Sequence, residues 1–92
     1  MHILNIEHAV PDFESWKAAF DGDPIGRERS GVRRYRVMRA SDDAGYVLID
    51  LEFDNEGEAM AAHAALRELW SRVSVMRDPK ARIVEVVDSH EY

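Results

Sequence analysis

The feature that most limits the fold of this chain is a pair of strand-like segments joined by turn-forming residues. Residues 32–39 and 46–53 are rich in Val, Tyr, Ile and Phe, and ASDDAG lies between them. β-Branched and aromatic residues favour strands, whereas Ser, Asp and Gly favour turns. The two segments therefore predict a β-hairpin.

The register of this hairpin determines what its arginines contact, because residues opposite each other share one face. One register places an acid opposite each of two arginines: Arg36 faces Asp50, Arg34 faces Glu52, and Met38 faces Leu48. That register also collects apolar residues on the other face, namely Tyr35, Val37, Val47, Ile49, Leu51 and Phe53. We therefore expect the arginines to pair with acids of the neighbouring strand, in preference to a substrate or nucleic acid.

The remaining segments alternate between strand and helix periods. Residues 2–8 alternate as a strand does, and Asp12 precedes the helical apolar spacing of DFESWKAAF. Residues 23–31 predict a loop, with Pro24 and two glycines. Asn55 and Glu58 form a capping-box signature before a helical stripe that reaches Val73. The β-branched residues of ARIVEVVDS predict a last strand over 81–88.

The predicted order is strand, helix, strand, strand, helix, strand. Two right-handed strand-helix-strand units of this kind give an α+β, ferredoxin-like βαββαβ sandwich with four antiparallel strands. Both helices then lie on one face of the sheet. Residues 1–92 show no repeat or linker, which predicts a single domain.

Composition excludes several classes of function. The chain has no cysteine, so it has no disulfide, thiolate metal site or cysteine nucleophile. A net charge of −6 disfavours nucleic acid and anionic membranes as partners. No apolar run approaches the ~20 residues that span a bilayer, and MHILNIEHAV lacks the features of a signal peptide, so we expect a cytoplasmic protein.

The sheet face without helices predicts self-association. On it we place the alternate residues of the first and last strands beside the charged pairs of the hairpin: Ile3, Asn5, Glu7, Ile83, Glu85 and Val87. Such a face is too apolar to be solvated throughout and too charged to be a dry core. Mixed faces of this kind suit a symmetric interface, so we expect a homodimer through this face.

The element order resembles the dimeric α/β-barrel superfamily, which includes small antibiotic-biosynthesis monooxygenase-like proteins. The similarity spans nearly the whole chain and is carried by VPDFESWKAAFD, by YVLIDLEFDNEGEA and by the closing strand ARIVEVVDS. It implies face-to-face packing of two sheets across a dimer and ligand pockets between each sheet and its own helices. Members include cofactor-free oxygenases, cyclase-like and isomerase-like proteins and haem-degrading enzymes.

The resemblance implies a ligand pocket on the helix side of the sheet. We expect His63 and Tyr35 as catalytic acid or base, and Trp16, Leu66, Trp70 and Arg33 as substrate-binding residues. His8, at a strand end, is a further candidate. An aromatic pocket with one imidazole and one phenol suits a small aromatic metabolite, with no cofactor.

Each of these residues also has a structural interpretation. Trp16 and Trp70 at helical spacing are typical of a core, and His63 among alanines is typical of helix packing. The histidines show no HxH or HExxH spacing, so no metal site is expected. Haem degradation by analogy requires a strand Asn on the pocket side, but alternation turns Asn5 away. The alternative to an enzyme is a non-enzymatic ligand-binding or protein-interaction module.

Overall fold

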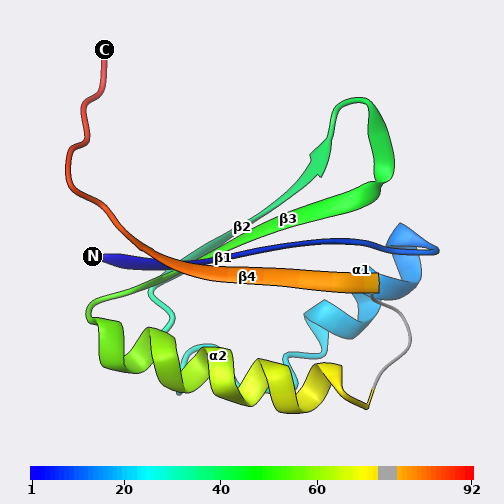
Figure 1. Ribbon diagram of the computed structural model, residues 1–92, viewed down its shortest axis with the longest axis horizontal. Helices are drawn as coiled ribbons and strands as arrows, with labels where there is room; N and C mark the ends of the chain where they lie inside the picture. Colours follow the sequence, from blue (N-terminus) through cyan, green and yellow to red (C-terminus); the bar gives the residue numbers. More distant parts are fainter. Residues whose placement is uncertain (73–76) are drawn as a thin grey trace.

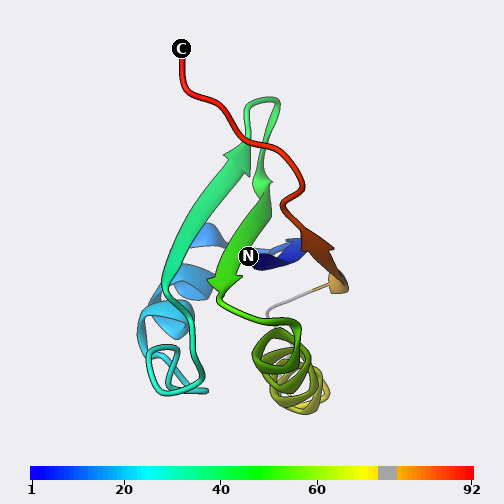
Figure 2. The same cartoon turned by 90° about the vertical axis from the view of Figure 1, so that its left-hand side faces the viewer.

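The computed structural model describes residues 1–72 and 77–92, and this part of the chain contains the predicted order of elements (Figure 1). The elements are β1 (His2–Ala9), α1 (Phe13–Asp21), β2 (Arg34–Ala40), β3 (Asp43–Phe53), α2 (Glu56–Trp70) and β4 (Arg77–Glu85). The strands form an antiparallel sheet in the order β2-β3-β1-β4, and both helices lie on one side of it (Figures 1 and 2). The ferredoxin-like fold is confirmed.

The predicted register of the β2–β3 hairpin is confirmed at every position that was assigned. The opposite pairs include Arg34 with Glu52, Arg36 with Asp50 and Met38 with Leu48. Arg34 Nε donates to Glu52 Oε2 at 2.8 Å, and Arg36 Nη2 donates to Asp50 Oδ2 at 3.1 Å. Exposed pairs of this kind contribute only a few tenths of a kcal/mol each, so they specify the register more than they stabilise the sheet.

The hairpin turn is tighter than the predicted ASDDAG loop. β2 continues to Ala40 and β3 begins at Asp43, so only Ser41 and Asp42 connect the strands. The register shifts between Arg39 and Ala40. A bulge of this kind accommodates extra residues without interrupting the pairing, which is why the turn formers lie partly inside the strands.

Both predicted helix caps are confirmed. Asp12 accepts a hydrogen bond from Ser15 N at 3.2 Å, and Asn55 Oδ1 accepts one from Glu58 N at 2.8 Å. Each bond satisfies an N–H group that the first helical turn leaves unpaired. α2 ends at Trp70 with Ser71 as its C-cap; the predicted extension of the stripe to Val73 concerns a residue outside the described ranges.

The core lies between the helix side of the sheet and the two helices. Its largest buried contributions come from the central strands and are Leu4, Ile6, Val47, Ile49, Leu51 and Phe53. Trp16 of α1 and the small residues Ala59 and Ala62 of α2 complete it. Because alanines face the sheet, α2 approaches it closely.

The prediction for the last strand was wrong in two respects. β4 begins at Arg77 and ends at Glu85, so both predicted limits, 81 and 88, are wrong. It includes Pro79, which an edge strand tolerates because one side of its backbone needs no partner. Ile83 lies opposite Leu4 and packs against the core, so it is on the helix side and not on the uncovered face. In IVEVV, valine or isoleucine occurs at both odd and even positions, so the alternation does not show which side faces the helices. The register with β1 decides it. Glu85 lies opposite His2 and shares the face of Ile83, so its predicted place on the uncovered face is also wrong. Val84, opposite Ile3, lies on the uncovered face, and Val87 lies beyond the end of β4.

The uncovered face carries a polar row across its centre. Asn5 Nδ2 donates to Asp50 Oδ1 at 2.7 Å, and Arg36 binds the other oxygen of the same carboxylate. Asp50 is only 8 % exposed, although no element of residues 1–72 and 77–92 covers this face. Arg82 lies opposite Asn5 in β4 and extends the row to the edge of the sheet.

We predict that Gly31→Ala lowers the free energy of unfolding by roughly 1–3 kcal/mol. Gly31 has φ +98°, and an added Cβ would collide with the Glu58 carboxylate. Gly57 is the matched control. It lies in the first turn of α2, and an added Cβ there would meet only Asn55 Oδ1, at 3.4 Å. Gly57→Ala should raise stability by about 0.5–1 kcal/mol. Urea denaturation of both variants tests this; equal effects of the two substitutions would contradict the role of the Gly31 conformation.

Candidate functional site

A small cavity of about 60 Å³ lies between the sheet and the two helices. Its walls are almost wholly apolar or aromatic, and every layer of the fold contributes to them. The lining residues are Ile6, His8, Trp16, Phe20, Pro24, Ile25, Arg27, Ile49, Leu51, Leu66 and Trp70. We call this space the inner cavity. It is the position at which the resemblance predicted a pocket.

His8 supplies a buried imidazole to the inner cavity. It is 1 % exposed and meets the Trp16 ring edge-on at 5.8 Å between centroids. Burial lowers the pKa of His8, and its hydrogen bond to the Ala9 carbonyl partly opposes that shift. Nδ1 lies 3.2 Å from Ala9 O, so Nδ1 carries the proton when it donates there. The neutral ring then presents the lone pair of Nε2 as a proton acceptor.

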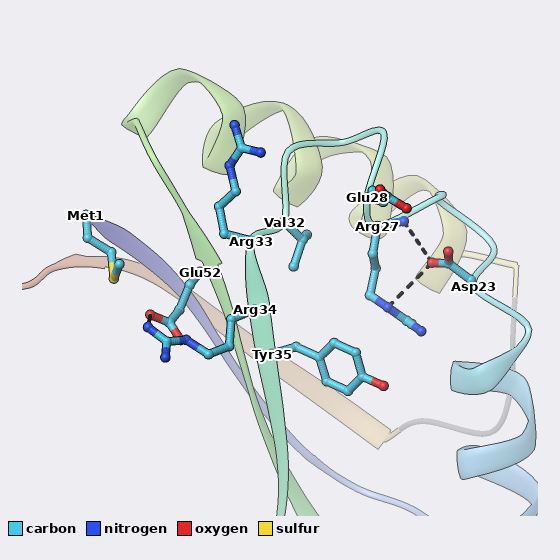
Figure 3. Close-up of a pocket in the computed structure, with 9 residues that line it drawn as sticks. All are labelled: Met1, Asp23, Arg27, Glu28, Val32, Arg33, Arg34, Tyr35 and Glu52. Carbon is cyan, nitrogen blue, oxygen red and sulfur yellow. Dashed lines mark hydrogen bonds and ion pairs between the residues drawn. The ribbon is translucent and has the colours of Figure 1, made fainter.

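A second, open hollow of about 750 Å³ lies at the β2 edge (Figure 3). Its lining is mixed in charge and consists of Met1, Asp23, Arg27, Glu28, Val32, Arg33, Arg34, Tyr35 and Glu52. We call it the outer hollow. Arg27 lines both spaces and therefore stands between them.

Contacts on several sides hold Arg27. Nη1 donates to Phe20 O at 2.8 Å, and Nε lies 3.5 Å from Asp23 Oδ1. The guanidinium carbon lies 4.0 Å from the centre of the Phe20 ring and 4.8 Å from that of Tyr35. These rings also contact each other edge-on at 5.2 Å. The cation thus lies against two aromatic rings.

The structure divides the predicted site residues between the two spaces. Trp16, Leu66 and Trp70 line the inner cavity, whereas Tyr35 and Arg33 line the outer hollow. His63 lines neither of these spaces. Its ring centroid is 6.5 Å from that of Trp70, and its pKa is lowered by burial and by Arg67. The catalytic role of His63 therefore stays a prediction.

Sequence reasoning gave His8 too little weight and did not identify Arg27. The strand alternation places His8 on the same face as Leu4 and Ile6, which is a usable signal for a buried imidazole. Arg27 lies in the 23–31 loop, which has no periodicity. Its position depends on tertiary contacts with Phe20 and Tyr35, so no local pattern indicates it.

Within the described residues, no three His, Asp or Glu side chains are placed to hold a metal ion. In the same ranges, no helix combines the length and apolarity needed to cross a membrane.

Neither a protein-family model nor a curated protein sequence matches the chain. Solved structures do match. A dimeric ferredoxin-like protein from an uncultured marine organism aligns with a TM-score of 0.71 at 8 % identity, covering 100 % of both chains. The chain has the ferredoxin-like fold of this structure.

Two further solved structures extend this comparison. An antibiotic biosynthesis monooxygenase aligns with a TM-score of 0.63 at 12 % identity, covering 96 % of this chain and 100 % of that one. A variant of MhuD with two manganese protoporphyrin IX molecules bound per active site aligns with a TM-score of 0.67 at 14 % identity, covering 100 % of both chains. Identities this low establish the fold and leave activity to the site itself.

We predict that His8 makes folding stability depend on pH near neutrality. Its folded-state pKa lies below 6.5, so the unfolded chain binds the proton more readily than the folded chain does. The free energy of unfolding should therefore fall as pH is lowered through 6.5, and this loss should end below the folded-state pKa. Urea denaturation from pH 8 to pH 5 measures it.

The matched variants are His8→Phe and His90→Phe. His8→Phe should remove part of the pH dependence, whereas His90→Phe, in the exposed C-terminal tail, should leave it unchanged. An unaltered slope in His8→Phe would show that this imidazole is not held in its neutral form by burial.

Proposed function

We propose that this chain is a homodimeric protein that binds a small aromatic metabolite between its sheet and its helices. The observation that carries the proposal is the apolar inner cavity with one buried imidazole, His8. A mostly apolar pocket with few polar groups is typical of small-molecule sites. The reaction class is proton abstraction, of the monooxygenase, cyclase or isomerase kind, without a metal or a nucleotide.

His8 is the proton acceptor in this proposal. Its neutral Nε2 can take a proton from a phenol or an activated carbon of the ligand, which the apolar lining of the inner cavity would surround. The resulting electron-rich anion is the species that would react with dioxygen or rearrange. Tyr35, which is 43 % exposed, lines the outer hollow and is not assigned a part in this proton transfer.

The inner cavity must enlarge to hold an aromatic ring. Its volume of about 60 Å³ is well below the ~150 Å³ of an engineered cavity that binds benzene. The wall toward the outer hollow consists of Phe20, Arg27 and Tyr35, which contact one another through their side chains. Movement of these side chains would join the two spaces.

The uncovered sheet face supports the homodimer. Met38 and Val84 are 36 % and 38 % exposed, beside the polar row centred on Asp50. The C-terminal tail leaves β4 on the side away from the helices, with Val87 86 % exposed (Figure 1). A second copy packed against this face would cover both sets of apolar side chains. The marine protein's description as dimeric agrees with this assembly.

Two other functions are less well supported. Tetrapyrrole binding on the MhuD pattern would require a far larger space than the inner cavity, and Asn5 points to the uncovered face, where it binds Asp50. A protein that only binds other proteins does not need a buried imidazole beside an unfilled cavity, as His8 is here. A non-enzymatic ligand-binding protein shares the proposed pocket and differs only in lacking turnover.

We predict that a ligand of the inner cavity stabilises the protein. A screen of small aromatic compounds by thermal shift should find ligands that, at a hundredfold their Kd, add about 2.7 kcal/mol to stability. Leu66→Trp should abolish the shift by filling the cavity from α2. Leu69→Trp is the control, since Leu69 lies on the same helix and does not line the cavity. Shifts that survive Leu66→Trp would place the ligand elsewhere.

We predict that Arg36→Glu weakens the homodimer at least about tenfold, because it places two carboxylates together on the uncovered face. Combining it with Asp50→Arg should restore part of the affinity. Arg72→Glu is the control, since it reverses a charge of the Arg72–Glu68 pair on the helix side. Sedimentation at low micromolar concentration tests all variants; a monomeric parent protein would refute the dimer outright.

A further inference from the structure

Among the described residues that line the inner cavity, Arg27 is the one with a permanent charge. Its side chain is 15 % exposed, compared with 60 % for Arg33 and 68 % for Arg34 in the outer hollow. A charge held in such surroundings interacts more strongly with an opposite charge than a solvated one does. Of the three arginines of the outer hollow, Arg27 is therefore the one suited to bind a ligand.

The other two arginines of the outer hollow, Arg33 and Arg34, are already paired with carboxylates. Arg33 Nε donates to Asp54 at 2.8 Å, and Arg34 donates to Glu52 at the same distance. Arg27 has a looser partner, since its Nε lies 3.5 Å from Asp23. Within the described residues, Nη2 of Arg27 has no hydrogen-bond acceptor, so the guanidinium keeps donors for a further anion.

The surroundings of Arg27 also accept a planar ring. Phe20 and Tyr35 flank the guanidinium, and Figure 3 shows the Tyr35 ring and the Arg27 side chain facing the same space. Aromatic side chains favour stacked or edge-on contacts with a second ring. A ligand with a ring and an anionic group would satisfy both kinds of surface together.

We propose that the ligand of this site is an aromatic carboxylate and that Arg27 is its carboxylate-binding residue. The inference rests on the proposed function and adds the charge of the ligand to it. The carboxylate pairs with the fork of the Arg27 guanidinium, and the ring lies between Tyr35 and the inner cavity. Binding draws Arg27 away from Asp23, which opens the wall toward His8.

The outer hollow is not uniformly basic, and this limits which anions fit. Asp23, Glu28 and Glu52 balance its three arginines in number. A highly charged anion such as a phosphate ester would meet these acids, whereas a single carboxylate can be received by Arg27 alone. The site therefore selects for one negative charge attached to an apolar body.

Benzoate and benzamide test the proposal, because they match in shape and differ in charge. The readout is the titration of the indole N–H resonances of Trp16 and Trp70, the two tryptophans of the chain, both of which line the inner cavity. The parent protein should bind benzoate at least about tenfold more tightly than benzamide, the factor expected of one charge-assisted hydrogen-bonded pair.

Two variants assign the preference to one residue. Arg27→Gln should remove the preference for benzoate over benzamide, because glutamine has no positive charge to pair with the carboxylate. Arg29→Gln, at an exposed position of the same loop, should keep the preference. Arg27→Lys should retain part of it, since lysine keeps the charge and loses the fork.

The outcomes separate this inference from the proposed function. Equal affinity of the parent protein for benzoate and benzamide overturns the carboxylate assignment but leaves the aromatic pocket in place. This measurement uses the parent protein alone, so it does not depend on whether a variant folds. A preference that persists in Arg27→Gln overturns the role of Arg27. Absence of any indole response to either compound overturns both this inference and the proposed pocket.

Discussion

The pairing of β2 with β3 in one register is the constraint on which the rest of the structure depends. That register faces Arg36 toward Asp50 and, through the alternation of the strands, turns Ile49 and Leu51 toward the helices. A shift by one residue would bring the charged set into the core and expose the apolar set. The small energy of each ion pair is therefore secondary to the large difference in buried apolar area between the two registers.

Most of the fold was predictable because its signals are local. The hairpin, the strand alternation of residues 2–8 and the caps at Asp12 and Asn55 each depend on residues close together in the sequence. The last strand was assigned to the wrong face because IVEVV is apolar in both parities. Its orientation is decided by pairing with β1, almost 80 positions away in the chain, and no local pattern contains that information.

The candidate site was predictable in part for the same reason. Trp16, Leu66 and Trp70 follow from helical spacing, and the structure brings them around one cavity. The structure does not bring His63 and Tyr35 to that cavity, and it places His8 there instead. Arg27 could not be placed from the sequence, because its position against Phe20 and Tyr35 depends on a loop conformation in which Asp23 has φ 52°. Sequence patterns locate side chains on loops least well, because loops have no periodicity that shows where a side chain points.

Pro79 in β4 has a consequence for how copies of the chain can meet. Proline offers no N–H to an incoming strand, and Lys80 and Arg82 follow it along that edge of the sheet. The opposite edge, β2, carries Arg34, Arg36 and Arg39. An unprotected edge strand can pair with strands of other chains and so lead to aggregation, and prolines and cations on the edge oppose this pairing. The two borders of the sheet thus resist extension into a fibre, which leaves stacking of flat surfaces as the route by which a finite assembly can form.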